Sequence, residues 1–353
     1  MIRFIFKRLG YGFLVLFGVV IVVFIIFHAL PGDPVSMLAG QRTDIATRES
    51  IASELGLEEP LHKQFLLYLN DLLPVSYHSD TPFNKKKYNY RKLLNMGKSH
   101  IVVIKKPYLR RSFQSNRRVD ELLLENIEST FVLAFSAMFI ATTIGIVLGV
   151  IAALNRNNWL DHLILSVSVF GISIPTFLSA IVFSILFGYY LSDWTGLNLT
   201  GQLWETHPII GKQLQLKNLI LPAITLGIRP LAIIVQLTRS SMLDVMSKDY
   251  IRTARAKGLN SISIFMKHAL KNAINPVITA VTGWLASLMA GAFFVEYIFD
   301  WKGLGFVTIK AVQSLDFPVV MGATLVIAII FIIINIFVDI LYAAVDPRIR
   351  LTE

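Results

Sequence analysis

The sequence contains no cysteine, which excludes disulfide bonds and thiolate metal sites. Charged residues are also few, at 16% of the 353 residues, whereas 54% are hydrophobic. Several apolar runs exceed the roughly 20 residues that a helix needs to cross a bilayer. The composition therefore predicts an all-α polytopic membrane protein and argues against a soluble two-domain chain.

Sequence motifs of enzymes are missing as well. The chain has no GxxxxGKS/T nucleotide loop, no HExxH zinc motif and no GxSxG nucleophile turn. Its histidines are scattered without the spacing of metal ligands. We therefore expect no catalytic residue, cofactor or metal in this chain. The net charge of +10 points to anionic lipids or acidic partners, and nucleic acid is not expected as a partner.

The apolar runs predict about six membrane-spanning helices. They are expected at about residues 9–30, 127–154, 162–191, 218–237, 276–298 and 319–344. The predicted domains are an N-terminal helix at 1–30, an extracytoplasmic region at 31–125, a core of five helices at 126–345 and a tail at 346–353. Lys and Arg are enriched in the short segments on one side, which predicts that both termini are cytoplasmic.

Three residues within or near these spans are candidates for a transport pathway. Arg229 would lie on the order of 16 Å deep in the fourth span, where an arginine costs ~2.5–3.5 kcal/mol on insertion scales. It either lines the pathway and attracts a substrate carboxylate or forms an internal ion pair or carbonyl contact. Pro175 predicts a kink in the third span, either for packing or to line the pathway. Glu296, near the outer end of the fifth span, is either an interfacial carboxylate or a gate or substrate contact.

A polar segment at Asp249–Pro276 separates two of the apolar runs. It predicts two short helices around Gly258, because glycine tolerates the positive φ that ends a helix. The second helix should bury one apolar stripe, consisting of Ile262, Phe265, Met266, Ala269, Leu270 and Ala273. Such a pair could face lipid, fill a socket in a soluble partner or bind DNA, and the flanking spans argue against DNA.

Several motifs together resemble one family of membrane proteins. They are RTARAKG at 252–258, PGDP at 31–34, LTRSSM at 237–242, FDWKGLG at 299–305 and DPRIR at 346–350. The chain resembles the permeases of ABC importers, in particular the dipeptide and oligopeptide (peptide/nickel) branch. Arg252 and Thr253 replace the Glu and Ala for which the family's EAA loop is named, and Lys302 replaces a proline. The resemblance covers residues 1–73 and 108–353.

The resemblance implies a type I ABC importer permease in the bacterial inner membrane that translocates dipeptides, oligopeptides or a related solute such as nickel. The implied partners are the lipid bilayer, a second homologous permease, two cytoplasmic ATPases that bind ATP and Mg, and an extracytoplasmic substrate-binding protein. A coupling loop at 238–276 would dock on the ATPase. The expected docking residues are Asp249, Ala254, Arg255, Gly258 and Leu259. The alternative is an ion-coupled secondary transporter, which usually carries an internal repeat that is not evident here.

The long first loop departs from the family's usual length. Its first part, 55–73, predicts a helix on the membrane surface, with an apolar stripe of Leu61, Phe65, Leu66 and Leu69. A basic insert follows at about 74–107, and its residues 101–104 predict a strand. The insert is either a solvated elaboration or a docking surface for the substrate-binding protein.

Overall fold

The computed structural model describes residues 2–29, 59–96 and 100–345. They belong to two compact units that alternate along the chain. The first unit contains residues 1–12, 126–306 and 327–353, and the second contains residues 13–125 and 307–326. The expected PGDP turn at 31–34 and the DPRIR end at 346–350 lie outside the described residues. The domain boundaries expected from composition stay a prediction.

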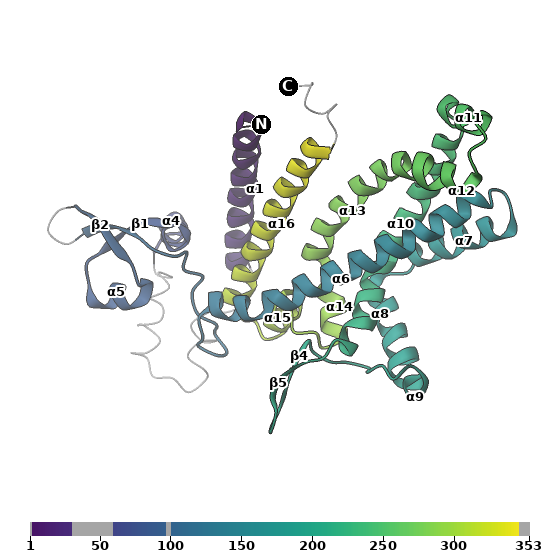
Figure 1. The fold of residues 1–353 in the computed structure, drawn as a ribbon. Helices are drawn as coiled ribbons and strands as arrows, with labels where there is room; N and C mark the ends of the chain where they lie inside the picture. The colour runs from purple at the N-terminus through teal and green to yellow at the C-terminus, as the bar shows by residue number, and fades with distance from the viewer. Residues whose placement is uncertain (1, 30–58, 97–99, 346–353) are drawn as a thin grey trace. The chain divides into compact units, whose positions relative to one another are not determined.

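The first unit is built from helices, some of which continue into the second. Figure 1 labels these helices along the chain. They are α1 (Ile2–Ala29), α6 (Val119–Leu154), α7 (Trp159–Ser173), α8 (Thr176–Ile185), η1 (Leu186–Tyr190), α9 (Ser192–Thr195), α10 (Lys217–Met246), α11 (Asp249–Ala256), α12 (Ser261–Ser263), η2 (Ile264–Leu270), α13 (Lys271–Gly291), α14 (Phe293–Ile298), α15 (Leu304–Gln313) and α16 (Phe317–Val345). A short antiparallel hairpin, β4 (Trp204–His207) and β5 (Gly211–Leu214), precedes α10.

Four of the described helices are long and apolar enough to cross a membrane, namely α1, α6, α10 and α16. Each of them covers all or nearly all of one expected span. The expected third span is instead a broken helix, because α7 and α8 meet at 106°. The expected fifth span, at about 276–298, falls on α13 and α14, neither of which is among the four. The described residues therefore give four spans, or five if the bent pair counts as one, where the sequence predicted about six.

The break between α7 and α8 has a local cause. Ile174 precedes Pro175 and has extended backbone angles, with φ −80° and ψ 130°. A proline excludes the helical conformation of the residue before it because its ring clashes with that residue's backbone. Pro175 then takes the N-cap position of α8 with φ −56°. The predicted kink is thus a sharp corner.

Glycines let α6 and α10 pack closely in the first unit. A Cβ atom on Gly149 would lie 2.5 Å from Thr238, and one on Gly145 would lie 2.8 Å from Ile234. Small residues permit such close backbone approach between membrane helices, where packing rather than the hydrophobic effect drives association. The α6–α10 pair therefore forms a tight centre for the unit.

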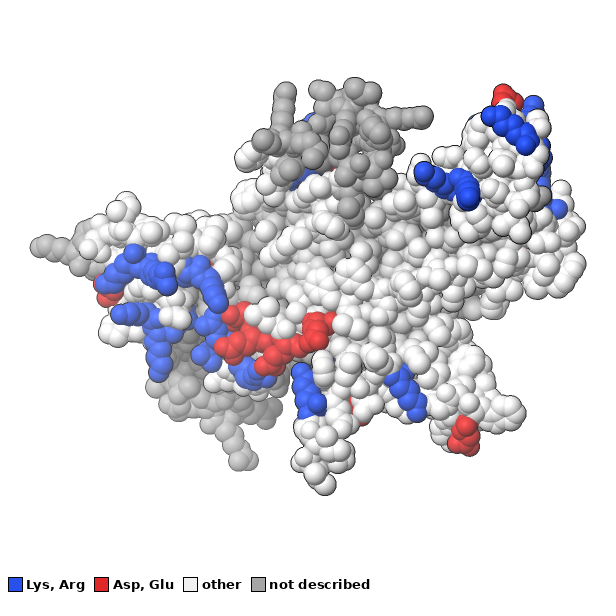
Figure 2. Space-filling model, in the orientation of Figure 1, with Lys and Arg blue, Asp and Glu red and all other residues white. Residues whose placement is uncertain are grey.

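The second unit carries a small α/β region in the long loop. Its elements are α4 (Leu61–Leu72), β1 (Val75–Ser79), α5 (Pro82–Tyr88), β2 (Arg91–Met96) and β3 (His100–Ile104). The strands form an antiparallel sheet in the order β1-β3-β2. The strand predicted at residues 101–104 is confirmed as β3. Figure 2 shows Lys and Arg side chains gathered over α5 and this sheet.

The core of the second unit joins the end of α1, α4 and the start of α16. Its buried residues are Val20, Val23, Phe27, Tyr68, Phe113, Phe317, Met321 and Leu325. The stripe predicted for α4 is wrong in part. Phe65 and Leu69 pack against this core, but Leu61 and Leu66 are exposed, whereas the polar Gln64 and Asp71 are buried.

Candidate functional site

A partly buried ion pair fixes the helix that leads into the expected coupling loop. Arg239, in the LTRSSM run of α10, donates hydrogen bonds from Nε and NH2 to the two carboxylate oxygens of Asp161, each at 2.6 Å. Asp161 is fully buried at the start of α7 and also accepts a bond from the Asn157 N–H at 3.0 Å. Bidentate pairs of this kind are strong and geometrically specific. The pair therefore holds α7 against the end of α10.

Gly258 ends α11 in a left-handed conformation with φ +75°. Its N–H donates to the Arg255 carbonyl at 2.9 Å, and the Leu259 N–H donates to the Ala254 carbonyl at 3.3 Å. This pair of bonds is the Schellman motif, which satisfies the last carbonyls of a helix. A Cβ atom at Gly258 would meet no atom within 4 Å. The backbone conformation, rather than crowding, selects glycine here.

The two predicted helices pack on each other through a small apolar core. Ile251 and Ala254 of α11 are buried. The cluster also contains Met242, Ala153, Ile264, Ala269 and Ala273. Ala254 was expected on the docking surface, and the structure corrects this. With 6% of its surface exposed, Ala254 holds the helix pair together from inside.

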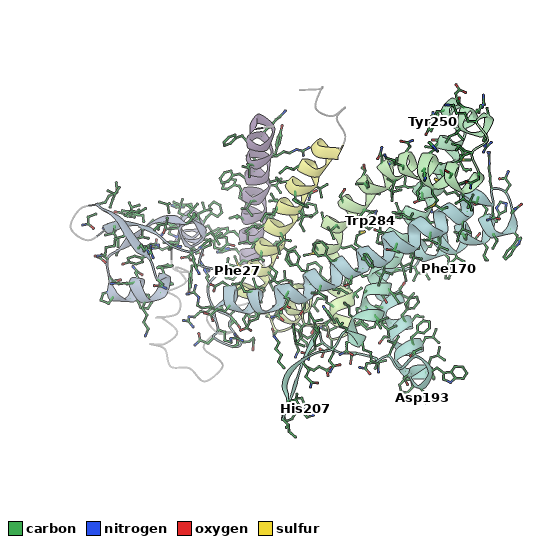
Figure 3. All side chains as sticks on the ribbon, in the orientation of Figure 1. Phe27, Phe170, Asp193, His207, Tyr250 and Trp284 are labelled. Carbon is green, nitrogen blue, oxygen red and sulfur yellow. The ribbon has the colours of Figure 1, made fainter. Side chains whose placement is uncertain are left out.

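The other expected docking residues are exposed. The Asp249 side chain is 93% exposed and pairs with Arg252 at 3.4 Å. Arg255 and Gly258 are exposed, and Leu259 is 41% exposed. In Figure 3, Tyr250 of this segment lies at one end of the first unit, and Asp193 and His207 lie at the opposite end. The structure thus presents this corner of the unit as a protruding polar surface.

The stripe predicted for the second helix of the pair is partly wrong. Ile262 and Met266 are 75% and 58% exposed, while Ile264 is buried. The cause is the π-helical turn η2, in which each hydrogen bond spans five residues. The wider turn changes which residues share a face, so a stripe drawn at the α-helical period selects the wrong isoleucine.

Glu296 is a fully buried carboxylate whose two oxygens are both hydrogen-bonded within the first unit. Oε1 accepts a bond from the Thr130 hydroxyl at 2.7 Å. Oε2 accepts bonds from the N–H groups of Gly305 and Phe306, at 2.7 and 3.0 Å. No part of the Glu296 side chain is accessible to a solute in this structure, and its expected role in the substrate pathway stays a prediction.

The FDWKGLG segment closes around this carboxylate. Trp301 is fully buried and donates from its indole nitrogen to the Ser129 carbonyl at 2.9 Å. A Cβ atom on Gly303 would lie 2.4 Å from the Thr130 hydroxyl and 2.5 Å from the Glu296 carboxylate. Glycine is required because the hydrogen-bonded carboxylate leaves no room. The segment therefore joins the start of α6 to α14 through buried hydrogen bonds, and we call this arrangement the buried lock.

Arg229 and Pro175 are both exposed on the first unit. No hydrogen bond or ion pair joins Arg229 to another of the residues that the structure describes, so the internal partner that was one of its two interpretations is not found there. A charge at this depth needs a cavity or a partner. On the neighbouring helix α13, Thr279, Gly283 and Ser287 line a shallow pocket beside Trp284 (Figure 3).

Within the described ranges, no group of three or more His, Asp or Glu residues could hold a metal ion. The expected absence of a catalytic residue and a cofactor stays a prediction.

Two family models match the sequence. The model described as the inner membrane component of binding-protein-dependent transport systems matches residues 145–351, and the model of the N-terminal part of such components matches residues 1–81. The chain belongs to this family. It is a membrane-embedded ABC importer permease, and the family match overturns the alternative of an ion-coupled secondary transporter. Both models leave out residues 82–144, which include most of the basic insert.

Full-length relatives are named as peptide permeases. The chain is 38% identical to the probable D,D-dipeptide transport system permease protein DdpB of Escherichia coli K12, with 95% of this chain and 94% of that protein covered. It is 35% identical to the dipeptide transport system permease protein DppB of the same organism and to the di/tripeptide permease DppB of Pseudomonas aeruginosa, with 99% of each chain covered.

A solved structure shares the permease fold. The inward-facing MetNI methionine ABC transporter matches with a TM-score of 0.50 and 19% identity, over 64% of this permease and 97% of that chain. At this identity the likeness concerns the fold alone. It agrees with the all-α polytopic architecture that the composition predicted.

Two features of the permease were not predicted from the sequence. Both join residues far apart in the chain: Asp161 with Arg239, and Thr130 with Glu296. Asp161 was one of only two charges in a very short turn between apolar runs, and that rarity was a signal. Nothing in the local sequence singled out Thr130.

Proposed function

We propose that this permease carries dipeptides or oligopeptides across the inner membrane. The support comes from the relatives, which are named as dipeptide and di/tripeptide permeases and match over nearly their whole length. The family also links the chain to a binding protein, so the proposed assembly contains an extracytoplasmic substrate-binding protein and a second homologous permease.

We further propose that the exposed face of the α11 corner docks on a cytoplasmic ATPase subunit, which binds ATP and Mg. The observation that carries this proposal is which residues of the α11 corner are buried and which are exposed. Ile251 and Ala254 are buried, while the side chains of Arg255 and of Leu259, which follows α11, are exposed. A short protruding helix pair with a rigid Schellman end suits insertion into a groove.

Motion of the docked corner would reach the membrane helices through two direct links. The helix pair packs on Met242 at the end of α10, and η2 continues without a break into α13. The Arg239–Asp161 pair then joins α10 to α7. Closure of the ATPases would rock these helices between inward- and outward-facing states, with the ATP chemistry wholly in the partner subunits.

Arg229 and Pro175 are the proposed pathway residues. Arg229 is exposed on a membrane-spanning helix without a partner in the described chain, which fits a position facing the second permease across a solvated pathway. Its guanidinium would attract the carboxylate of a peptide. The proposed topology has both termini in the cytoplasm, because the α11 corner must be on the ATPase side.

Reconstitution tests this function. The permease would be assembled in liposomes with a second permease, the ATPases and a binding protein, and uptake of a radiolabelled dipeptide would be measured. We expect uptake that requires ATP and the binding protein and that vanadate abolishes. Uptake driven by an ion gradient without ATP would contradict the ATPase coupling. ATP-dependent uptake of another solute but not of dipeptides would contradict only the substrate assignment.

A further inference from the structure

The sheet of the second unit has one covered face and one open face. The covered face consists of Ser76 and His78 of β1 and Ile101 and Val103 of β3, all buried. Tyr90 joins Ile101 and Val103 in a small core, and the ring of Tyr88 stacks 4.2 Å from His78. The interior of this region therefore lies on one side of the sheet only.

The opposite face is mostly apolar yet uncovered, and it also carries Arg91, which pairs with Ile104, and His100, which pairs with Met96. Strand register brings its residues together, because directly paired residues of antiparallel strands share a face. Val75 pairs with Ile104, and Val102 pairs with both Tyr77 and Leu94. We call the set of Val75, Tyr77, Leu94, Met96, Val102 and Ile104 the apolar sheet face. Leu94 is 67% exposed and Met96 57%, whereas a sheet face in water is normally polar.

Helix α4, which precedes the sheet, shows part of the same inversion. Its buried residues include Gln64, which hydrogen-bonds to His28 at 2.7 Å, and Asp71, which accepts a bond from the Tyr88 hydroxyl at 2.8 Å. Leu61 and Leu66 are each 61% exposed. Phe65 and Leu69 still pack inward, so the inversion is partial. Exposed leucines beside buried polar residues fit apolar surroundings on that side of the helix.

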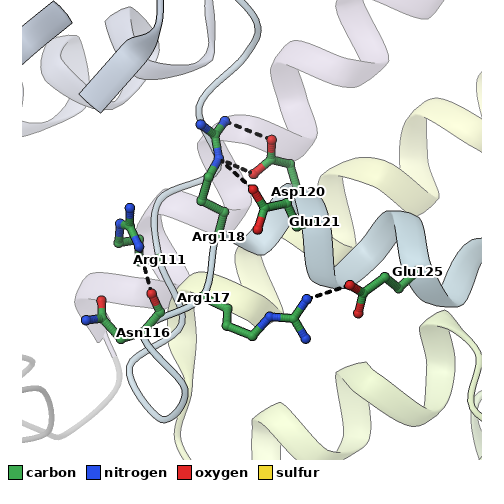
Figure 4. A network of polar contacts seen from close by, with 7 residues as sticks. All are labelled: Arg111, Asn116, Arg117, Arg118, Asp120, Glu121 and Glu125. Carbon is green, nitrogen blue, oxygen red and sulfur yellow. Dashed lines mark hydrogen bonds and ion pairs between the residues drawn. The ribbon is translucent and has the colours of Figure 1, made fainter. Parts of the chain in front are cut away.

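The apolar sheet face carries an unbalanced positive charge around it. Residues 74–107 contain eight Lys and Arg residues and one acidic residue, Asp80, for a net charge of +7. The nearby arginines are different, since Arg117 pairs with Glu125 and Arg118 pairs with Asp120 and Glu121 (Figure 4). The excess charge therefore belongs to the insert, and it complements an anionic surface.

Short connections tie this region to the ends of two membrane-spanning helices. Gln64 of α4 hydrogen-bonds to His28 in the last turn of α1. The eight residues from Gln64 to the end of α4 extend about 12 Å. On the other side, Ser112 and Phe113 donate hydrogen bonds to Asp316, the residue before α16. The sheet is thus held near the boundary where α1 and α16 leave the bilayer.

From these observations we infer that the apolar sheet face rests on a phospholipid surface. Its leucine, methionine and tyrosine side chains enter the interfacial layer, and exposed basic residues bind anionic headgroups. Those basic residues are Arg91, which pairs with Ile104 on this face, and Lys106. The insert then anchors the long loop to the membrane surface. This role is neither of the two interpretations that the sequence offered. The inference does not depend on the transported solute.

Because the chain has no cysteine, single labels can be placed without removing native thiols. Leu94→Cys and Met96→Cys, on the apolar sheet face, would carry an environment-sensitive fluorophore in the full transporter reconstituted in nanodiscs. Lys86→Cys on α5 is the matched control, since it is exposed and shares its helix with Tyr88 on the covered side. Quenching by brominated acyl chains and by aqueous iodide would be measured with phosphatidylglycerol present or replaced by phosphatidylcholine.

We expect brominated lipid to quench both sheet labels about threefold more than the Lys86 label, and we expect weaker quenching without the anionic lipid. Equal quenching at all three positions would overturn the inference. So would sheet labels that iodide reaches freely until binding protein is added, because that result would identify the face as a protein-docking surface. Using two labelled positions guards against a local effect of either substitution.

Discussion

Two of the motif segments that carry the family resemblance differ in where their side chains lie, one inside the fold and the other on its surface. In Phe299–Gly305, Trp301 and Leu304 are buried and the segment hydrogen-bonds within its own unit. In Asp249–Leu259, three basic side chains and Leu259 are exposed, and only Ile251 and Ala254 point inward. A motif match cannot distinguish a segment that builds the fold from one that meets a partner. Exposure of the side chains separates the two.

The glycines of the two segments show the same difference. Gly303 is fixed by crowding, since a methyl group there would overlap the Thr130 hydroxyl. Gly258 has open space around it and is fixed by its φ of +75°. Substitutions at the first position should damage folding, and substitutions at the second should act through the shape of an exposed corner.

The largest expected effect is at the buried lock. Glu296→Ala leaves the Thr130 hydroxyl and the N–H groups of Gly305 and Phe306 without an acceptor, which should cost about 3 kcal/mol or more. Thermal unfolding of the purified permease in detergent would show a clear loss of stability. Glu296→Gln retains one acceptor oxygen, so its stability should lie between that of wild type and that of Glu296→Ala. A Glu296→Ala permease as stable as wild type would contradict the structural role of the lock.

Arg229 should affect transport without affecting folding. Loss of a charge-assisted hydrogen bond to the peptide carboxylate should raise KM about 10- to 100-fold in Arg229→Gln. Arg229→Lys should retain part of the affinity because it keeps the charge. Uptake of a dipeptide and of its C-terminal amide would be compared. The amide should be insensitive to the substitution, and an equal loss for both peptides would contradict carboxylate recognition.

The effect of a substitution at Gly258 should depend on whether the new residue tolerates a positive φ, and not on the size of its side chain. Gly258→Val places a β-branched residue at positive φ, at a cost of about 1–2 kcal/mol that should loosen the end of α11. Gly258→Asn is the matched control, because asparagine tolerates this conformation. Hydrogen exchange of residues 249–259 and ATP-driven uptake would be measured. Equal behaviour of the two variants would show that the left-handed corner is unimportant.

The smallest effect concerns His78 in the insert. Burial, with a contribution from the Lys105 charge, lowers the pKa of His78 to about 4 from its usual 6.5, and the Asp71 charge acts in the opposite direction. Between these pH values the unfolded state binds the proton and the folded state does not. The insert should therefore lose stability as pH falls from 6.5 towards 4. Hydrogen exchange of β1 would show this.

His78→Phe should flatten that pH dependence, whereas His207→Phe, at an exposed position outside the insert, should leave it unchanged. A pH dependence that survives in His78→Phe would mean that another group is responsible.

The sequence predicted what depends on local pattern and missed what depends on contacts across the chain. Apolar length located α1, α6, α10 and α16, and the glycine at 258 located the corner of the coupling segment. The α7–α8 corner at Pro175 was underestimated, because proline permits both a kink and a break. The role of Glu296 required knowing that Thr130, 166 residues earlier, donates to it. The π-helical turn η2 changed the buried face in a way that no fixed period describes.

The most direct test of the division between these two segments is co-purification with the ATPase subunits. Arg255→Glu reverses an exposed charge on the proposed docking face, and Lys302→Glu makes the same change at an exposed position in the outer motif. We predict that Arg255→Glu loses most of the bound ATPase at unchanged permease yield, while Lys302→Glu retains it. Full retention in Arg255→Glu, or equal loss in both variants, would contradict the assignment of the α11 corner as the ATPase-docking surface.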